Sequence, residues 1–435
     1  MKFSKYNSLL GLTSQSSIIY NSKEDKCIIF KKEDESLLCL LPEVVKNKNH
    51  RLFNQLREIN AIVDSNINEL EEVVQLSKKI VNDDSIFKLI IIPTMDCNFS
   101  CWYCYESHIV GSKLSSKTIN SIYKLIDNIL ESNPNLKNFT LSFFGGEPLL
   151  YYNKTTKLII DYIRTKYVYY SYIDFSINFT TNGYLLNDNI VKHLLEKDEP
   201  KHFQITLDGG RNKHNRVRYT IEKEGSYDRI IQSIKILIKN RVEVLLRVNY
   251  TAKNIESTKD ILTDFGDISL EDKKYLKIGF FRIWQDKKKM NIENIVDRII
   301  TKYQDNNFRV SNDNAILDEL KNPCYADKKN ELLVNFNGDI YKCTARDFNK
   351  KNKLGKLNEK GNVVWLKDKL EEWGNIKIQS KMCRCCRILP LCGGGCHQIN
   401  IETKGMDLCH MGYSESDKNR IILNRLSALF VNEEV

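Results

Sequence analysis

The sequence predicts an α/β protein built around a partial (β/α)6 TIM-like barrel. Six apolar, strand-like runs alternate with amphipathic stretches between residues 87 and 312, which is the pattern of parallel βα units. With 435 residues, the chain is long enough for two or three domains. We expect a small N-terminal module over residues 1–86, the barrel over 87–312, and a cysteine-rich domain over 313–435.

The barrel elements follow from the periodicity of the apolar residues. Alternation and β-branched residues predict six strands, over residues 87–92, 139–143, 173–180, 202–207, 243–250 and 276–281. Helical periodicity predicts the intervening helices, over residues 116–130, 154–166, 190–195, 228–238 and 255–265. In barrels of this type the active site forms at the C-terminal ends of the strands.

The N-terminal module combines strands with helices. Residues 17–20 and 27–30 read as strands, and residues 51–59 and 67–81 read as helices. Asn66 followed by Glu69 resembles a capping box at the start of the second helix. We expect a winged-helix-like module, which could bind a partner or simply pack as a cap on the barrel.

Composition limits the class of protein. No apolar run approaches a membrane span, and the N-terminus lacks a signal-peptide core, so we expect a cytoplasmic protein without a membrane partner. The net charge of +10 fits a nucleic-acid or anionic peptide partner, but it also fits lysines on solvated helix faces. Because no nucleic-acid-binding motif accompanies the charge, we expect no nucleic-acid partner. Thirteen cysteines in a large chain of this class indicate metal rather than disulfides.

Three of these cysteines follow the first barrel strand. Cys97, Cys101 and Cys104 have the spacing CxxxCxxC. Thiolates select zinc or iron–sulfur clusters, and three of them would leave one iron of a four-iron cluster open to a small molecule. The alternatives are a zinc knuckle completed by His108, or three unrelated thiols.

Other strand ends carry short polar motifs. Gly145-Gly146-Glu147-Pro148 follows the second strand, where the glycines allow backbone to approach a ligand and the carboxylate can pair with an amine. Thr181-Asn182-Gly183 follows the third strand, and Leu207-Asp208-Gly209 follows the fourth, with Arg216 and Arg218 beyond it. Arg247 and Asn249 point the same way from the fifth strand. Taken singly, each motif also fits an ordinary turn or a surface charge.

Seven further cysteines occupy the C-terminal segment. They are Cys324, Cys343, Cys383, Cys386, Cys392, Cys396 and Cys409, with Gly338 placed five residues before Cys343. A zinc ribbon accounts for at most four of them.

Taken together, the triad and the strand-end motifs resemble the radical S-adenosylmethionine (SAM) enzymes, and the seven cysteines resemble the SPASM (twitch-type) extension of that family. The resemblance implies a catalytic [4Fe–4S] cluster on Cys97, Cys101 and Cys104 whose open iron binds SAM. It implies cofactor contacts from Tyr103 at the adenine, from Gly146 and Glu147 at the methionine amino group, from Asn182, and from Arg218 at the carboxylate, with Arg216 as a neighbouring candidate.

The same resemblance implies three [4Fe–4S] clusters in all. Cys324, Cys343 and Cys396 would hold an inner auxiliary cluster, and Cys383, Cys386, Cys392 and Cys409 an outer one. The inner cluster lacks an obvious fourth ligand, so its open iron could bind a substrate thiolate. Cys385 remains unassigned.

The N-terminal module resembles, by position, the precursor-recognition domains of ribosomal peptide (RiPP) maturases, which bind a leader peptide at a sheet edge. We therefore expect an oxidoreductase that forms a thioether or carbon–carbon crosslink in a precursor peptide, with flavodoxin or ferredoxin as external electron donor. The alternative enzyme is an anaerobic sulfatase-maturing enzyme. Relatives of that kind carry a catalytic Asp directly after the cysteine matching Cys343, where this chain has Thr344, so Asp347 would have to replace it. The non-enzyme alternative is an iron–sulfur electron carrier, which would need neither an open iron nor Glu147 and Arg218.

Overall fold

A computed structural model describes residues 1–286, 292–312, 320–374, 378, 380–403 and 406–432. The chain divides into two compact units. The barrel unit comprises residues 84–313 and 330–366, and the cysteine-rich unit comprises residues 1–83, 314–329 and 367–435.

Six parallel strands form the centre of the barrel unit and pair in the order of the sequence. They are β6 (Ile86–Ile91), β7 (Asn138–Phe143), β8 (Asp174–Thr181), β9 (Lys201–Leu207), β10 (Glu243–Tyr250) and β11 (Leu276–Arg282). All six predicted strands are confirmed to within a residue or two, as is the α/β fold with a partial barrel. Because every strand runs the same way, the loops that follow them gather at one end of the sheet.

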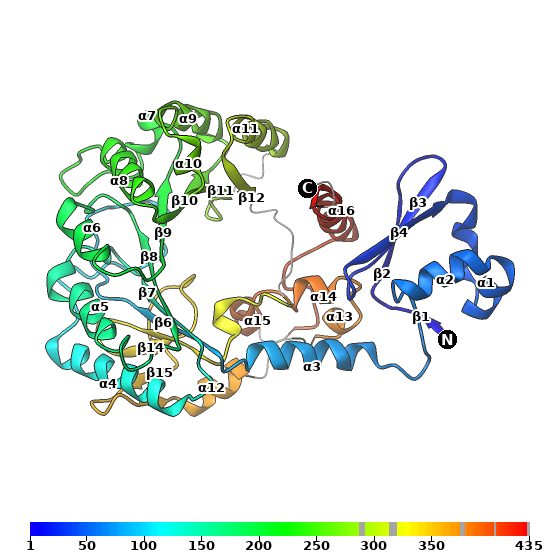
Figure 1. Cartoon of the computed structure of the whole chain (residues 1–435), viewed down its shortest axis with the longest axis horizontal. Helices are drawn as coiled ribbons and strands as arrows, with labels where there is room; N and C mark the ends of the chain where they lie inside the picture. Colours follow the sequence, from blue (N-terminus) through cyan, green and yellow to red (C-terminus); the bar gives the residue numbers. More distant parts are fainter. Residues whose placement is uncertain (287–291, 313–319, 375–377, 379, 404–405, 433–435) are drawn as a thin grey trace. The chain divides into compact units, whose positions relative to one another are not determined.

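Helices cover the outer face of this curved sheet (Figure 1). The longer ones are α4 (Ser116–Ser132), α5 (Thr156–Arg164), α6 (Asp188–Leu194), α8 (Tyr227–Lys239) and α11 (Glu293–Asp305). Shorter pieces are η2 (Tyr152–Lys154), α7 (Arg211–His214), η3 (Ile255–Asp260), α9 (Ile261–Asp264) and α10 (Leu270–Lys273). The apolar stripes of the helices and alternate strand residues, such as Phe139, Phe179 and Phe203, bury one another in a single core.

The sheet extends beyond the six predicted strands on both sides. On one side, β12 (Arg309–Asn312) lies parallel to β11. On the other, β13 (Glu331–Val334) lies parallel to β6 and continues into the antiparallel strands β14 (Asp339–Tyr341), β15 (Gly355–Leu357) and β16 (Val363–Trp365). This pairing places residues 330–366 in the barrel unit, so the compact units cut across the expected third domain of 313–435.

The N-terminal part of the cysteine-rich unit is an antiparallel sheet followed by helices. The sheet contains β2 (Asn7–Gly11), β3 (Ser16–Asn21) and β4 (Lys26–Lys31), and β1 (Lys2–Phe3) pairs separately with β5 (Ile62–Val63). The helices are η1 (Lys32–Cys39), α1 (Pro42–Lys48), α2 (His50–Glu58) and α3 (Glu69–Val81). The predicted cap of α3 is wrong: Asn68 rather than Asn66 accepts the first-turn hydrogen bond, from the Glu71 amide, because the helix starts at Glu69.

The C-terminal part of this unit shares a core with the N-terminal sheet. It contains η4 (Tyr325–Asp327), α12 (Lys367–Gly374), α13 (Lys381–Arg384), α14 (Leu389–Cys392), α15 (His397–Glu402) and α16 (Glu415–Asn432). Helix α16 lies beside the three-stranded sheet (Figure 1), and its Ile422 and Leu426 pack with Ile18 and Tyr20 of β3. Within the described residues, none of the helices combines the length and apolar character that crossing a bilayer requires.

Candidate active site

The three cysteines of the triad lie on the loop that follows β6. The Cys104 amide donates to the Cys101 carbonyl at 3.0 Å, and the Phe99 amide donates to the Cys97 sulfur at 3.4 Å. Burial raises the pKa of all three thiols, to about 11 for Cys104. Thiols in such surroundings become thiolates when a metal centre binds them, so the loop fits an iron–sulfur cluster.

His108 approaches the triad, as the zinc alternative requires. Its Nε2 lies 3.5 Å from the Cys104 sulfur. In the described part of the chain, however, no three His, Cys, Asp or Glu side chains converge as they do on a single metal ion. A four-iron cluster places its thiolates on separate irons, so its ligands need not converge on one point.

The glycine loop after β7 packs directly against the start of the triad loop. Gly146 has φ +47°, and a Cβ there would lie 2.3 Å from the carbonyl oxygen of Asp96, the residue before Cys97. The Glu147 amide donates to that same oxygen at 2.9 Å, and the Gly146 amide donates to Glu106 at 2.8 Å. Only glycine permits this close backbone approach.

Glu147 is fully buried at the junction of β7 and β8. One carboxylate oxygen accepts from the Thr181 hydroxyl at 2.7 Å and the Leu149 amide at 3.0 Å, and the other accepts from the Asn182 amide at 2.8 Å. Burial raises the pKa of this carboxyl. The carboxylate thus joins two strand ends, while its contact with a cofactor amine stays a prediction.

Asn182 lies beside the triad. Its side-chain amide donates to Asn98 at 2.8 Å and lies 4.0 Å from the Cys97 sulfur. The third strand end is therefore next to the first, as the parallel barrel predicts.

A buried polar network connects Tyr103 to the fourth and fifth strands. The Tyr103 hydroxyl donates to Asp208 at 2.8 Å and accepts from Arg218 at 2.9 Å and from the Asn249 amide at 3.2 Å. Arg218 is buried and Arg216 is exposed, so Arg218 is the arginine of this network.

Two polar atoms of this network have no partner among the described residues. They are Oδ2 of Asp208 and Nε of Arg218, on side chains that are almost completely buried. Burial raises the pKa of Asp208 to about 6. Orphaned buried groups of both charges beside three thiols fit a polar, charged ligand such as SAM.

Two residues of the network had no role assigned from sequence. Asp208 could have been found because it stands at the C-terminal end of a parallel strand. His214 gave no such signal: it accepts from the Asp208 amide at 3.2 Å and lies 2.9 Å from the Ser226 hydroxyl. Burial lowers the pKa of His214 well below its usual value, so a neutral imidazole holds the loop that carries Arg218.

Asp347 lies next to the triad loop, in the same unit. Its carboxylate accepts from the Ser107 amide at 2.9 Å and the Ser107 hydroxyl at 2.7 Å. The Tyr105 hydroxyl also donates to the Thr344 carbonyl, at 2.6 Å. These bonds join the loop after Cys343 to the loop after Cys104, and the catalytic role of Asp347 stays a prediction.

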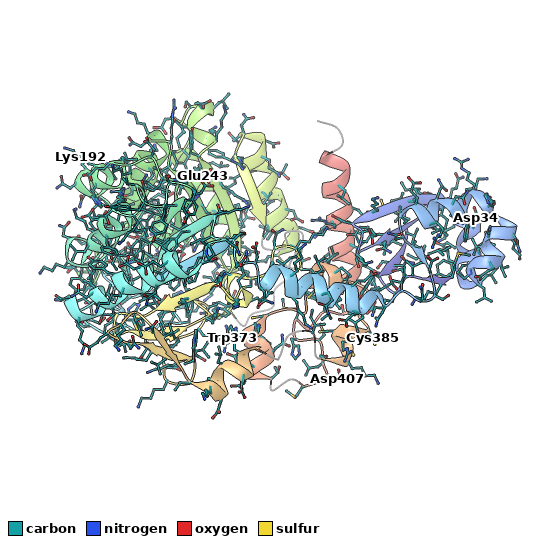
Figure 2. The ribbon with its side chains drawn as sticks, turned by 60° about the horizontal axis from the view of Figure 1, so that its bottom comes forward. Asp34, Lys192, Glu243, Trp373, Cys385 and Asp407 are labelled. Atoms are coloured by element: carbon teal, nitrogen blue, oxygen red, sulfur yellow. The ribbon has the colours of Figure 1, made fainter. Side chains whose placement is uncertain are left out.

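The four cysteines expected to hold the outer cluster belong to the cysteine-rich unit. Burial raises the pKa of Cys383, and the neighbouring Cys409 and Cys386 raise it further. Cys386 and Cys392 pack around Ile388 and Leu391. Asp407, labelled with Cys385 in Figure 2, accepts from the Met382 amide at 3.0 Å and so holds helix α13. Cys385 itself is exposed.

Cys324 and Cys396 are also in the cysteine-rich unit, whereas Cys343 is in the barrel unit. The Nδ1 atom of His397 lies 3.1 Å from Asp327, and its ring stacks on Trp373, labelled in Figure 2, with centroids 4.5 Å apart. This contact joins the turn after Cys324 to the helix after Cys396. Assignment of these three cysteines to one cluster stays a prediction.

Comparison with known proteins identifies the central domain. The model of the Radical SAM superfamily matches residues 91–265. The radical SAM cyclopropyl synthase TigE of Paramaledivibacter caminithermalis is 24% identical over 411 residues, covering 86% of this chain and 82% of TigE. A cysteine-type anaerobic sulfatase-maturating enzyme of Clostridium novyi is 30% identical over 186 residues, covering 40% of this chain and 46% of that enzyme.

Solved structures share the fold. anSMEcpe with bound AdoMet and Kp18Cys peptide has a TM-score of 0.60 at 18% identity, covering 80% of this chain and all of that one. Streptococcus suis SuiB bound to the precursor peptide SuiA has a TM-score of 0.53 at 17% identity, covering 92% of this chain and 96% of SuiB. With the triad, the glycine loop and the buried network in place, the chain carries a Radical SAM domain, a family that implies a [4Fe–4S] cluster and SAM, and it is similar to maturases over most of its length.

Proposed function

We propose that this enzyme matures a ribosomally made precursor peptide and forms a crosslink in it, with the leader bound by the N-terminal module. The observation that carries the proposal is the extent of the likeness to SuiB, whose structure was solved with its precursor peptide. The match leaves 8% of the 435 residues uncovered, about 35 residues, which is fewer than the 83 of the N-terminal segment. Part of that segment is therefore included in the match. The anSMEcpe match leaves 20%, about 87 residues, which is enough to omit it.

The roles of the residues follow from their positions. When bound, the cluster and SAM would supply the radical chemistry, namely a 5′-deoxyadenosyl radical able to take a hydrogen atom from the substrate. Cys97, Cys101 and Cys104 would hold the cluster, and the Asn182 amide lies 4.0 Å from the Cys97 sulfur. Asp208 and Arg218 each offer SAM a buried polar atom that has no partner in the part of the chain that the structure describes, and Tyr103 holds both side chains in place.

For the bond that is formed, the relative TigE favours a carbon–carbon link over a thioether. TigE is named a cyclopropyl synthase and is similar over most of both chains. A cyclopropyl ring consists of carbon–carbon bonds. Formylglycine formation on a sulfatase is supported less, because the alignment with the sulfatase-maturating relative covers only 40% of this chain.

We further propose two auxiliary clusters, with the ligand sets predicted from sequence, and a flavodoxin or ferredoxin as electron donor. The outer cluster is supported by two observations: Cys383 is near Cys409 and Cys386, and Cys386 and Cys392 pack against the same buried core. The auxiliary clusters would accept the electron that crosslinking releases.

The test is peptide modification by the full-length enzyme, reconstituted with iron and sulfide without oxygen. A short reading frame found beside the gene would supply the peptide, assayed with and without its leader. We expect loss of a pair of hydrogens and an internal link, found by tandem mass spectrometry, for the leader-bearing peptide only. Leader-independent conversion of a sulfatase-derived cysteine peptide to an aldehyde, with the precursor untouched, would overturn the proposal.

Deleting the N-terminal module is not a clean test of leader binding, because its residues share cores with the cysteine-bearing helices. A point change serves better. Ile29 is 49% exposed on β4, an edge strand of the sheet. Ile29→Asp should weaken leader binding, whereas Leu158→Asp, at a 39% exposed position on α5 of the barrel, should not.

A further inference from the structure

Tyr6 occupies an unusual position in the cysteine-rich unit. It stands just before β2 in the N-terminal module and is completely buried. It packs in one cluster with Val73 of α3 and Leu389 of α14, and the half-buried Cys383 and Cys386 pack against the same cluster. A side chain of the N-terminal module therefore belongs to the buried group of residues against which two expected ligands of the outer cluster pack.

The Tyr6 hydroxyl has no hydrogen-bond partner among the described residues. An unsatisfied buried hydroxyl is costly, so native structures seldom retain one without a reason. Three other fully buried tyrosines each donate a hydrogen bond: Tyr20 to Asp25 at 2.7 Å, Tyr227 to Asp264 at 2.7 Å, and Tyr303 to the Thr258 carbonyl at 2.5 Å.

The surroundings of the Tyr6 hydroxyl indicate which hydrogen-bond acceptor it could reach. The half-buried thiols of Cys383 and Cys386 pack against the hydrophobic cluster that contains Tyr6. A phenol hydroxyl can donate one hydrogen bond, and no acceptor in the described residues receives it. Cluster sulfurs accept hydrogen bonds, and such bonds set cluster potentials.

We propose that the Tyr6 hydroxyl donates a hydrogen bond to a sulfur atom of the iron–sulfur cluster held by Cys383, Cys386, Cys392 and Cys409, and so raises the reduction potential of that cluster. The inference rests on the outer cluster of the proposed function. A donor near the cluster stabilises the added negative charge of the reduced form more than that of the oxidised form. Tyr6 is thus a positioning residue that makes the cluster a better electron acceptor.

The test uses the full chain with Cys97, Cys101 and Cys104 changed to Ala, so that only auxiliary clusters are present. Redox titration followed by electron paramagnetic resonance should then give their midpoint potentials. In Tyr6→Phe, we expect one midpoint potential to become more negative by up to about 59 mV, which for one electron is a tenfold change in the reduction equilibrium. The matched control Tyr20→Phe removes a buried hydroxyl that is bonded to Asp25, and it should shift neither midpoint.

A second variant guards against a local packing effect. Tyr6→Met also lacks a donor and fills the site with an apolar chain, so it should shift the same midpoint in the same direction. Full iron content with unshifted midpoints in both Tyr6 variants would overturn the inference and leave the outer cluster standing. Absence of iron from the well-folded triad-free protein would instead refute the auxiliary clusters, and the inference with them.

Discussion

Gly146→Ala is the sharpest perturbation of the SAM site, because it adds one methyl group where backbone meets backbone. The new Cβ would lie 2.3 Å from the Asp96 carbonyl oxygen and 2.9 Å from the Met95 carbonyl carbon. Neither atom can rotate away as a side chain would. Relief of the overlap must therefore move the loop that begins at Cys97 or the loop that carries Glu147.

The magnitude can be worked out from these contacts. Alanine at φ +47° costs roughly 1–2 kcal/mol in the left-handed region. Loss of the 2.9 Å bond from the Glu147 amide to Asp96 costs about 1 kcal/mol more. The left-handed cost falls on the free and the SAM-bound protein alike, so the part that can fall on SAM binding is the lost bond of about 1 kcal/mol, which lowers SAM affinity roughly fivefold.

Gly111→Ala is the matched control. Gly111 has φ +74°, but a Cβ there would meet no atom within 4 Å. Alanine at position 111 carries the conformational cost without the overlap, so the SAM affinity of Gly111→Ala should stay close to that of the wild type. The assay is calorimetric SAM titration of anaerobically reconstituted protein, with iron content measured in parallel. Equal SAM affinities in the two alanine variants, at full iron, would refute the close-approach argument.

Three further predictions concern single carboxyl groups. Glu147→Gln should weaken SAM binding by roughly 1.5–3 kcal/mol if the carboxylate also meets the cofactor amine. Thr181→Val removes the hydroxyl that donates to Glu147 and accepts from the Gly183 amide, so it should mainly lower the melting temperature; equal SAM affinities in the two variants would reject the amine contact. Burial raises the pKa of Asp208 from 3.8 to about 6. Raising the pH through that window therefore charges a buried carboxyl, which should destabilise the SAM-free protein and strengthen the binding of cationic SAM. Asp208→Asn should remove the first pH dependence in thermal melts and the second in SAM titrations. Asp347→Asn should keep an acceptor for Ser107 and retain peptide crosslinking measured by mass spectrometry, whereas loss of modification with intact SAM cleavage would assign Asp347 as a catalytic base.

Much of the barrel could be predicted because the residues of each strand form a recognisable local pattern. Residues 139–143 and 243–250 alternate or run apolar between turn signals, and helical periodicity lies between them. The placement of β13 against β6 could not be read in the same way. Leu332 and Leu89 are neighbours in the sheet but more than two hundred residues apart in the chain, and the periodicity of a strand does not name its partner.

The candidate site likewise has a part that the sequence predicts and a part that only the structure reveals. Cys97, Gly146 and Asn182 stand in recognisable motifs, and the structure brings their loops together. The network around Tyr103 needed the structure, because Asp208, Arg218 and Asn249 come from separate segments and meet only through one hydroxyl. Tyr6 carried no sequence signal at all, since a lone tyrosine before a strand reads as ordinary core.

The most direct test of the account is deuterium transfer from peptide to cofactor. The reduced wild-type enzyme would be incubated with SAM and a leader-bearing precursor that is deuterated at its carbon-bound positions, and the 5′-deoxyadenosine would be analysed by mass spectrometry. We predict deuterium in the 5′-deoxyadenosine together with crosslinked peptide, and neither in the variant with Cys97, Cys101 and Cys104 changed to Ala. Unlabelled 5′-deoxyadenosine and unmodified peptide, from enzyme that binds the precursor and cleaves SAM, would contradict the claim that this enzyme acts on that peptide.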